Sequence, residues 1–186
     1  GQAISLTGSS LVQFALVWWM TRTTGSATIL ATATLIAMLP RILLAPFAWA
    51  LVDRWNRKAV MIVADSLIAL ATLVLMLLFA LGRESIWAVY IILLVRAAGG
   101  AFHSPAESAS VSLMVPKAHL ARIAGLNQTL EGVLSIVSPP LGALLISFLP
   151  MQGVMAIDVG TAIIAVTILA FISIPQPPRQ LAQANG

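Results

Sequence analysis

Cysteine is absent from the 186-residue chain, and charged residues make up only 9% of it. Without cysteine there is no disulfide framework, no thiol nucleophile and no thiolate metal site. Soluble domains carry about 25% charged residues, so a chain this poor in charge cannot cover a water-facing surface. Its few basic residues are dispersed and form no patch interleaved with aromatic side chains, which excludes a nucleic-acid-binding surface.

Sequence patterns of common enzymes are missing as well. The chain contains no H-E-x-x-H, no G-x-S-x-G and no phosphate loop of the G-x-x-x-x-G-K-[ST] kind. We therefore expect no catalytic residue, no bound metal and no cofactor. An ATP-driven pump would need a partner chain to supply the nucleotide site.

Long hydrophobic runs are what the chain has in excess, since 60% of its residues are apolar. A membrane-spanning helix needs about 20 apolar residues, and six such runs with short connections occupy most of the sequence. We predict an all-α membrane protein with one six-helix domain over residues 1–174 and a linker or disordered tail over 175–186. The predicted helices cover residues 4–20, 28–52, 59–81, 86–102, 130–149 and 154–174. The more polar stretch 103–127 is expected to form a surface loop containing a short amphipathic helix.

Basic residues gather on one set of the predicted connections. That set holds Arg54, Arg57, Lys58, Lys117, Arg122 and Arg179, whereas the other set holds only Arg22 and Arg83. Because loops rich in lysine and arginine stay on the cytoplasmic side, we predict a multi-pass protein of the cell (inner) membrane with both termini in the cytoplasm.

Several ionisable residues lie inside the predicted helices. An arginine at the bilayer centre costs about 2.5–3.5 kcal/mol on insertion scales, so such residues should face the protein interior or a wet cavity. They are candidates for a proton or substrate pathway and comprise Arg96, Asp65, Glu131, Asp158 and Arg41. Arg96 and Arg41 also have a structural interpretation, in which the guanidinium binds backbone carbonyls freed at a break or a proline. His103 is placed at the membrane interface, with proton relay as the alternative.

Small residues mark two further helical faces. Gly8, Ser9 and Ser10, together with Gln2 and Gln13, form a small polar face on the first helix, suited to close helix packing or to lining a polar cavity. On the fifth helix, the run over 138–143 combines two prolines with small residues, which predicts a bend that lets the helix seal against a neighbour. A plain packing kink explains that run as well.

These motifs together resemble the major facilitator superfamily. Asp53, Arg54, Arg57 and Lys58 match its G-x-x-x-D-R-x-G-R-K loop, with Trp49 and Asn56 standing at the two glycine positions. Asn56 tolerates the left-handed backbone that glycine would supply, whereas the Trp49 indole prevents a close helix approach. Arg96 and Gly100 match an arginine and glycine of the fourth helix. Ser138, Pro139, Gly142 and Ala143 are similar to the G-P-x-x-G-G element of exporters that exchange drug for proton.

The resemblance implies one half of a transporter, built as two inverted three-helix repeats. Within the family, the charged loop acts as a conformational latch, for which Glu107 is a candidate partner of Arg54 or Arg57; simple anchoring to anionic lipid is the alternative. The first helix looks like the opening of macrolide-efflux-type and siderophore-exporter-type members.

The expected function is therefore proton-coupled export of a small amphipathic compound such as a drug or macrolide, with this chain as the N-terminal half. The partners are the lipid bilayer, the exported small molecule and a second six-helix half, supplied by another copy or by a missing C-terminal half. The alternative is a non-transporting membrane module, an isolated or engineered half that is inert or assembles as a homodimer.

Overall fold

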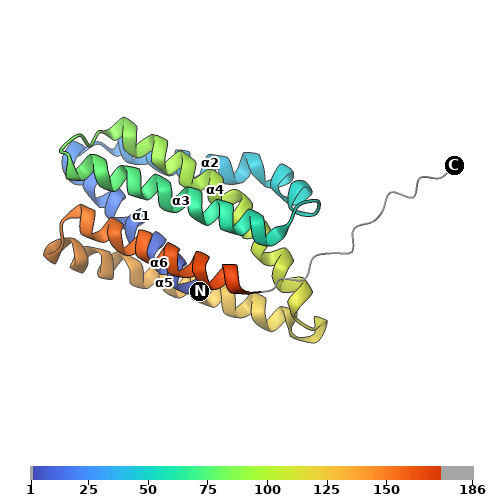
Figure 1. Ribbon diagram of the computed structural model, residues 1–186. Coiled ribbons are helices and arrows are strands. Elements are labelled where there is room, and N and C mark those ends of the chain that lie inside the picture. The colour runs from blue at the N-terminus through green and yellow to red at the C-terminus, as the bar shows by residue number, and fades with distance from the viewer. Residues whose placement is uncertain (1, 173–186) are drawn as a thin grey trace.

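Six α-helices joined by short turns make up the computed structural model, which describes residues 2–172 (Figure 1). In chain order they are α1 (Gln2–Thr24), α2 (Ala27–Val52), α3 (Arg57–Ala80), α4 (Ile86–Met114), α5 (Lys117–Phe148) and α6 (Met151–Phe171). All six are long and apolar enough to cross a membrane. The predicted all-α architecture of six transmembrane helices is thus confirmed. The predicted tail over 175–186 lies outside the described residues.

Helix ends follow local sequence signals. The side chains of Ser26, Asn56 and Ser85 accept hydrogen bonds from backbone N–H groups in the first turns of α2, α3 and α4, at 3.5, 3.1 and 3.2 Å. Such N-caps satisfy donors that have no partner inside the helix. Gly25 and Gly82 take positive φ angles of 60° and 63° in the turns after α1 and α3, which glycine adopts without steric cost.

The predicted surface loop over 103–127 is wrong. α4 continues through this region to Met114, and α5 begins at Lys117. Pro105 lies inside α4 without ending it, because neighbouring helices can compensate for the lost hydrogen bond in a membrane bundle. The chain breaks only at Val115, whose extended backbone (φ −116°, ψ 132°) is the conformation favoured before a proline such as Pro116.

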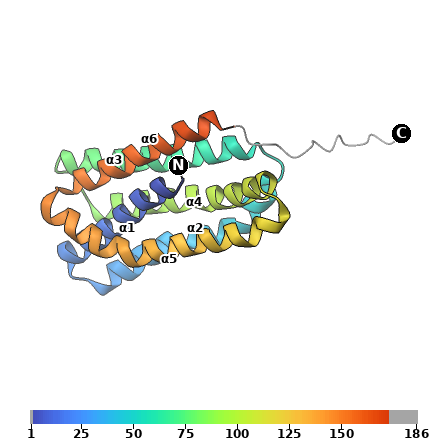
Figure 2. The same cartoon turned by 90° about the horizontal axis from the view of Figure 1, so that it is seen from below.

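The bundle has three layers of two helices each (Figure 2). α3 and α6 form one outer layer, α1 and α4 the middle layer, and α2 and α5 the other outer layer. α1 packs on α5 and α6, while α4 packs on α2 and α3, and α3 packs on α6. Large apolar side chains such as Leu16, Met20, Leu75, Leu93 and Met155 are fully buried between the layers.

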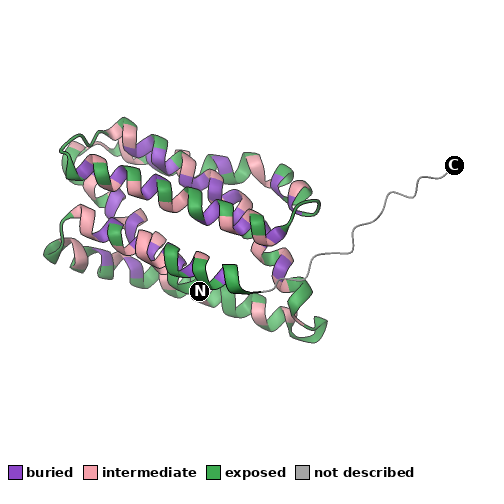
Figure 3. Ribbon diagram, in the orientation of Figure 1, coloured by how far each residue is buried: buried purple, intermediate pink, exposed green. Residues whose placement is uncertain are grey.

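α2 and α5 are the most exposed helices (Figure 3). On α5, only Ser138 and Gly142 are buried. Exposed apolar residues on the two helices include Phe47 and Ile136. This layer therefore presents a largely apolar surface to lipid or to another membrane helix.

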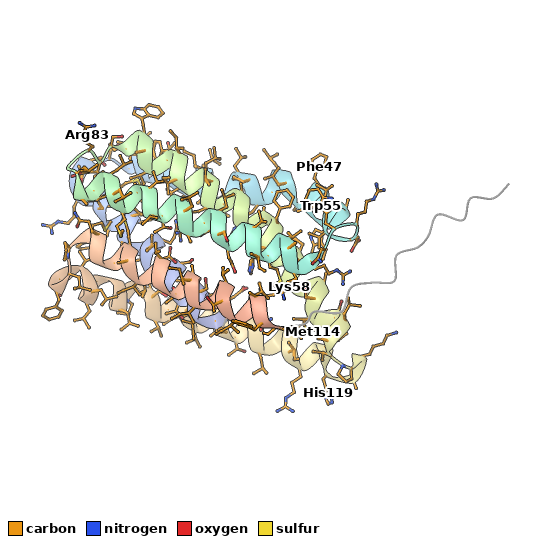
Figure 4. All side chains as sticks on the ribbon, viewed as in Figure 1. Phe47, Trp55, Lys58, Arg83, Met114 and His119 are labelled. Carbon is orange, nitrogen blue, oxygen red and sulfur yellow. The ribbon has the colours of Figure 1, made fainter. Side chains whose placement is uncertain are left out.

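Charge is distributed unequally between the two ends of the bundle. Trp55, Lys58 and His119 lie at one end, and Arg83 lies at the other (Figure 4). The predicted grouping of basic connections thus corresponds to one physical end of the molecule. Which side of the membrane that end faces stays a prediction.

Candidate functional site

A cavity of about 570 Å³ lies inside the bundle, and all six helices contribute to its lining. Most of the lining comes from α1 and α4, which share the middle layer. Seven hydroxyl-bearing residues and one amide give the wall a polar character: Ser5, Ser9, Ser10, Gln13, Thr34, Ser104, Ser135 and Ser138. Leu93, Phe14 and Met38 add apolar surface. Ser9, Ser10 and Gln13 of the small polar face predicted on the first helix line this cavity, whereas Gly8 faces α6.

Arg96 and Asp158 form a buried ion pair next to the cavity. Arg96 Nη1 lies 2.5 Å from Asp158 Oδ2, and the two side chains are 8% and 1% exposed. Arg96 also donates to the hydroxyl of Thr72, which donates in turn to Asp158 Oδ2 at 3.0 Å. Ser9 donates to the other oxygen, Oδ1, at 2.9 Å. The Asp158 carboxylate thus accepts three hydrogen bonds, from α1, α3 and α4, at the junction of four helices.

Gly8 makes this junction possible. A Cβ at Gly8 would collide with the hydroxyl of Thr161 and would lie 3.0 Å from the Asp158 Cα. The missing side chain lets α1 approach α6 closely enough for Ser9 to reach the carboxylate.

A second ionisable cluster joins α3 to α4. His103 Nε2 lies 3.2 Å from Asp65 Oδ1, and His103 Nδ1 lies 3.9 Å from Glu107 Oε2. Asp65 and His103 are buried and line the cavity, and Asp65 Oδ2 has no hydrogen-bond partner among residues 2–172. The interfacial placement of His103 is therefore wrong. The sequence spacing indicated this position, because His103 follows Arg96 by seven residues. Seven residues are two helical turns, so both side chains lie on the same face of α4.

Arg41 enters the cavity from α2. A Cβ at Gly100 would lie 3.7 Å from its Nη2, so the guanidinium extends over this glycine of α4. Within the part of the chain that the structure describes, Arg41 makes no hydrogen bond or ion pair. The structural interpretation, in which it binds a carbonyl freed by Pro40, has no support in these contacts. Glu131, by contrast, is exposed on α5 and does not line the cavity.

The charged loop between α2 and α3 ties helix ends together. Arg57 donates to the backbone oxygen of Ala109 at 2.7 Å and lies 3.7 Å from Asp53. Lys58 donates to the backbone oxygens of Ala170 and Ile172 at 2.7 and 2.8 Å. The start of α3 is thereby attached to the late turns of α4 and the C-terminal end of α6.

Two details of this loop differ from expectation. Asn56 has a φ of −67° and caps α3, so it does not adopt the left-handed backbone that the glycine comparison suggested. Glu107 has His103 as its charged neighbour, and no ion pair joins it to Arg54 in the described region. Trp49 is about half exposed on α2, so no neighbouring helix in the described chain covers its side chain completely.

The bend motif of α5 packs against α1. Gly142 is buried, and a Cβ there would collide with the ring of Phe14. Ser138 is buried and, together with Pro139, lines the cavity, whereas Ala143 is exposed. α5 remains a continuous helix through its two prolines. The small residues thus permit a close contact between α1 and α5.

The family model of the Major Facilitator Superfamily matches residues 1–186. The chain belongs to this superfamily. It is 41% identical to a macrolide efflux protein A from Streptococcus pyogenes over 176 residues, which cover 95% of the chain and 44% of that relative. A macrolide efflux protein A from Enterococcus faecalis is 40% identical over 152 residues, covering 82% and 47% of the two chains. An uncharacterized transporter of the superfamily from Bacillus subtilis is 32% identical over 148 residues, covering 80% and 34%.

The chain therefore spans less than half the length of the curated relatives it matches. No solved structure matches it. Membership confirms the predicted family and the likeness to its macrolide-efflux members.

Proposed function

We propose that this chain is the N-terminal six-helix half of an efflux-type secondary transporter. In this proposal it exports a small amphipathic compound, such as a drug or macrolide, in exchange for protons. The observation that carries the proposal is the cavity between α1 and α4, which holds two buried ionisable clusters within an apolar bundle. Buried charges in membrane helices are costly and mark substrate or ion pathways.

The lining of the cavity suits an amphipathic substrate. Hydroxyl groups of α1 and α5 offer adaptable hydrogen-bond partners, while Phe14, Met38 and Leu93 offer apolar contact. Arg41 adds a guanidinium without an intramolecular partner in the described chain. We assign Arg41 to substrate contact because it lines the cavity and its exposed guanidinium remains available to a bound molecule.

The two ionisable clusters have different roles in this proposal. Asp158 is saturated by Arg96, Thr72 and Ser9, so its carboxylate is poorly placed to exchange a proton. His103 lies between two carboxylates, Asp65 and Glu107, and Asp65 keeps one oxygen without a hydrogen bond in the described part of the chain. An imidazole changes its charge near neutral pH. We therefore assign the coupling proton to the Asp65–His103 pair and a structural role to the Arg96–Asp158 pair.

The loop over 53–58 acts as the conformational latch in this proposal. Arg57 and Lys58 hold α3 through backbone oxygens near the ends of α4 and α6. A movement of α3 relative to these helices would break both sets of bonds. The loop thus stabilises the conformation seen here relative to a second conformation in which α3 has moved.

A second six-helix half completes the transporter in this proposal. The α2 and α5 layer is exposed and apolar, and a partner covering it would enclose the cavity (Figures 2 and 3). The most extensive helix contacts also support two inverted three-helix repeats. Exchanging α1, α2 and α3 for α4, α5 and α6 maps these pairs onto one another, namely α2–α4, α3–α4, α3–α6, α1–α6 and α1–α5. The partner is a C-terminal half or a second copy of this chain.

Efflux from proteoliposomes tests the function. The chain is reconstituted alone, with the full-length Streptococcus pyogenes relative as a parallel sample, and loss of radiolabelled erythromycin is followed under an imposed pH gradient. We expect gradient-dependent efflux from the relative, and from this chain alone if a second copy serves as its partner half. Efflux by the relative alone would favour the non-transporting module for this chain by itself. Efflux that ignores the gradient in both would reject proton coupling.

A further inference from the structure

A second hollow lies on the outside of the bundle, between the beginning of α3 and the middle of α4. Its volume is also about 570 Å³. Val63 and Leu67 of α3 face Ala98, Gly99 and Phe102 of α4 across it. α3 and α4 lie close together beneath the groove, because Gly99 has no side chain to keep Ile68 away. A Cβ at Gly99 would lie 2.9 Å from Ile68 Cγ1. The result is an apolar groove along two membrane-spanning helices.

One end of the groove is polar. Arg54, Trp55 and Asn56 line it there, at the end of the bundle where Figure 4 shows Trp55 and Lys58. Trp55 is about half exposed, as is common for an indole at the level of lipid headgroups. The groove thus runs from the depth of the headgroups toward the hydrocarbon core.

Arg54 differs from its basic neighbours in the loop. Lys58 and Arg57 bind backbone oxygens of α6 and α4. Arg54 is exposed, and its guanidinium makes no hydrogen bond or ion pair with any residue in the described range. It is therefore the loop cation that remains available to an external anion, and it lies directly at the polar end of the groove.

We propose that this groove binds an anionic phospholipid. One acyl chain lies between α3 and α4, and the phosphate pairs with the Arg54 guanidinium. The argument rests on charge complementarity and on depth. A basic side chain at the membrane surface attracts anionic lipid, a guanidinium matches the geometry of phosphate oxygens, and the apolar groove begins beside it. This site is separate from the cavity and does not depend on the proposed transport function.

Native mass spectrometry of the purified chain in detergent, with added phosphatidylglycerol or phosphatidylcholine, tests the site. We expect more phosphatidylglycerol than phosphatidylcholine to remain bound. Arg54→Gln should weaken retention of phosphatidylglycerol by roughly fivefold, which is the effect of about one basic residue near an anionic surface. Arg83→Gln is the matched control, because it removes an exposed arginine at the opposite end of the bundle, and it should change nothing.

A second pair of variants tests the groove itself. Ala98→Leu places a larger side chain in the groove, while Ala88→Leu makes the same change on α4 outside it; both alanines are partly exposed. We expect only Ala98→Leu to reduce retention of phosphatidylglycerol, with circular dichroism confirming that both variants stay folded. Equal retention of the two lipids by the unaltered chain, or unchanged retention in both Arg54→Gln and Ala98→Leu, would overturn the proposal.

Discussion

Asp158 carries a charge that the membrane would otherwise exclude. Its side chain is 1% exposed, and its two oxygens accept hydrogen bonds from three residues on three other helices. Removing one member of such a pair leaves the other charge buried without compensation, which costs more than the pair itself contributes. The stability of Arg96 and Asp158 variants should therefore be measured before any loss of transport is interpreted.

The Arg96–Asp158 pair gives a double-mutant prediction. Arg96→Met and Asp158→Asn should each lower the free energy of unfolding by about 3–5 kcal/mol, because each leaves one buried charge unpaired. The double variant should recover much of this loss. Reversible unfolding in mixed detergent micelles, followed by circular dichroism, measures all three. Losses that simply add in the double variant would show that the two charges do not stabilise one another.

The Asp65–His103 pair gives a different prediction. His103→Gln should abolish efflux driven by a pH gradient, yet retain exchange of labelled for unlabelled erythromycin, which needs no net proton movement. His119→Gln is the control, because His119 is the other histidine of the sequence and is exposed at the end of the bundle. Gradient-driven efflux that persists in His103→Gln would remove this pair from the coupling mechanism. Exchange lost together with efflux would instead indicate a damaged substrate path.

Sequence reasoning identified the separate charges but not their pairing. An arginine and several aspartates inside hydrophobic runs are visible at once, because each is costly in lipid. Their partners depend on helix rotation, which a sequence does not specify. Thr72 gave no signal in the sequence, and Ser9 gave none beyond its place on the small polar face of the first helix. His103 was misplaced because residues 103–127 were interpreted as a loop, and a loop has no buried face.

Close approach of α1 to its neighbours depends on glycine. Gly8 faces the Asp158 backbone on α6, and Gly142 of α5 faces the ring of Phe14 on α1. These two contacts place α1 between α5 and α6 and set the width of the cavity. Small residues at helix crossings are the usual device for such packing in membranes.

Two glycine substitutions separate packing from helix propensity. Gly8→Ala should destabilise the bundle by about 1–3 kcal/mol, because the new methyl group collides with Thr161 and the α6 backbone. Gly160→Ala on α6 is the matched control, since a Cβ there meets nothing within 4 Å. It should be neutral or slightly stabilising, by at most about 1 kcal/mol. Thermal unfolding of the two variants compares them directly, and equal losses would show that α1 does not need close contact at Gly8.

Hydrophobic length predicted the helices better than polarity predicted the loops. Six runs of about 20 apolar residues specify six helices almost regardless of detail. The polar stretch 103–127 was misinterpreted because polar residues in a membrane protein can face a cavity or the aqueous end of a helix without breaking it. Only the Val115–Pro116 step interrupts the helix, through the restriction that proline imposes on the residue before it.

Taken as a whole, the molecule is asymmetric in both charge and coverage. Both outer layers pack on the middle layer, but α2 and α5 leave more of their residues exposed than α3 and α6 do (Figures 2 and 3). The chain also spans less than half of its macrolide efflux relatives. In the transporter proposed above, the exposed layer is the surface on which the second half would pack.

Membrane orientation can be tested by labelling single introduced cysteines. The chain contains no cysteine of its own, so none has to be removed first. Five basic residues of the described chain lie at one end, namely Arg54, Arg57, Lys58, Lys117 and Arg122, against Arg22 and Arg83 at the other. Positive loops remain in the cytoplasm, so His119→Cys should react with a membrane-impermeant maleimide only after permeabilisation. Glu84→Cys, in the turn before α4, should react in intact spheroplasts, and its lost acidic charge has little influence on topology. The reverse labelling pattern would place the loop over 53–58 outside the cell and contradict the predicted orientation.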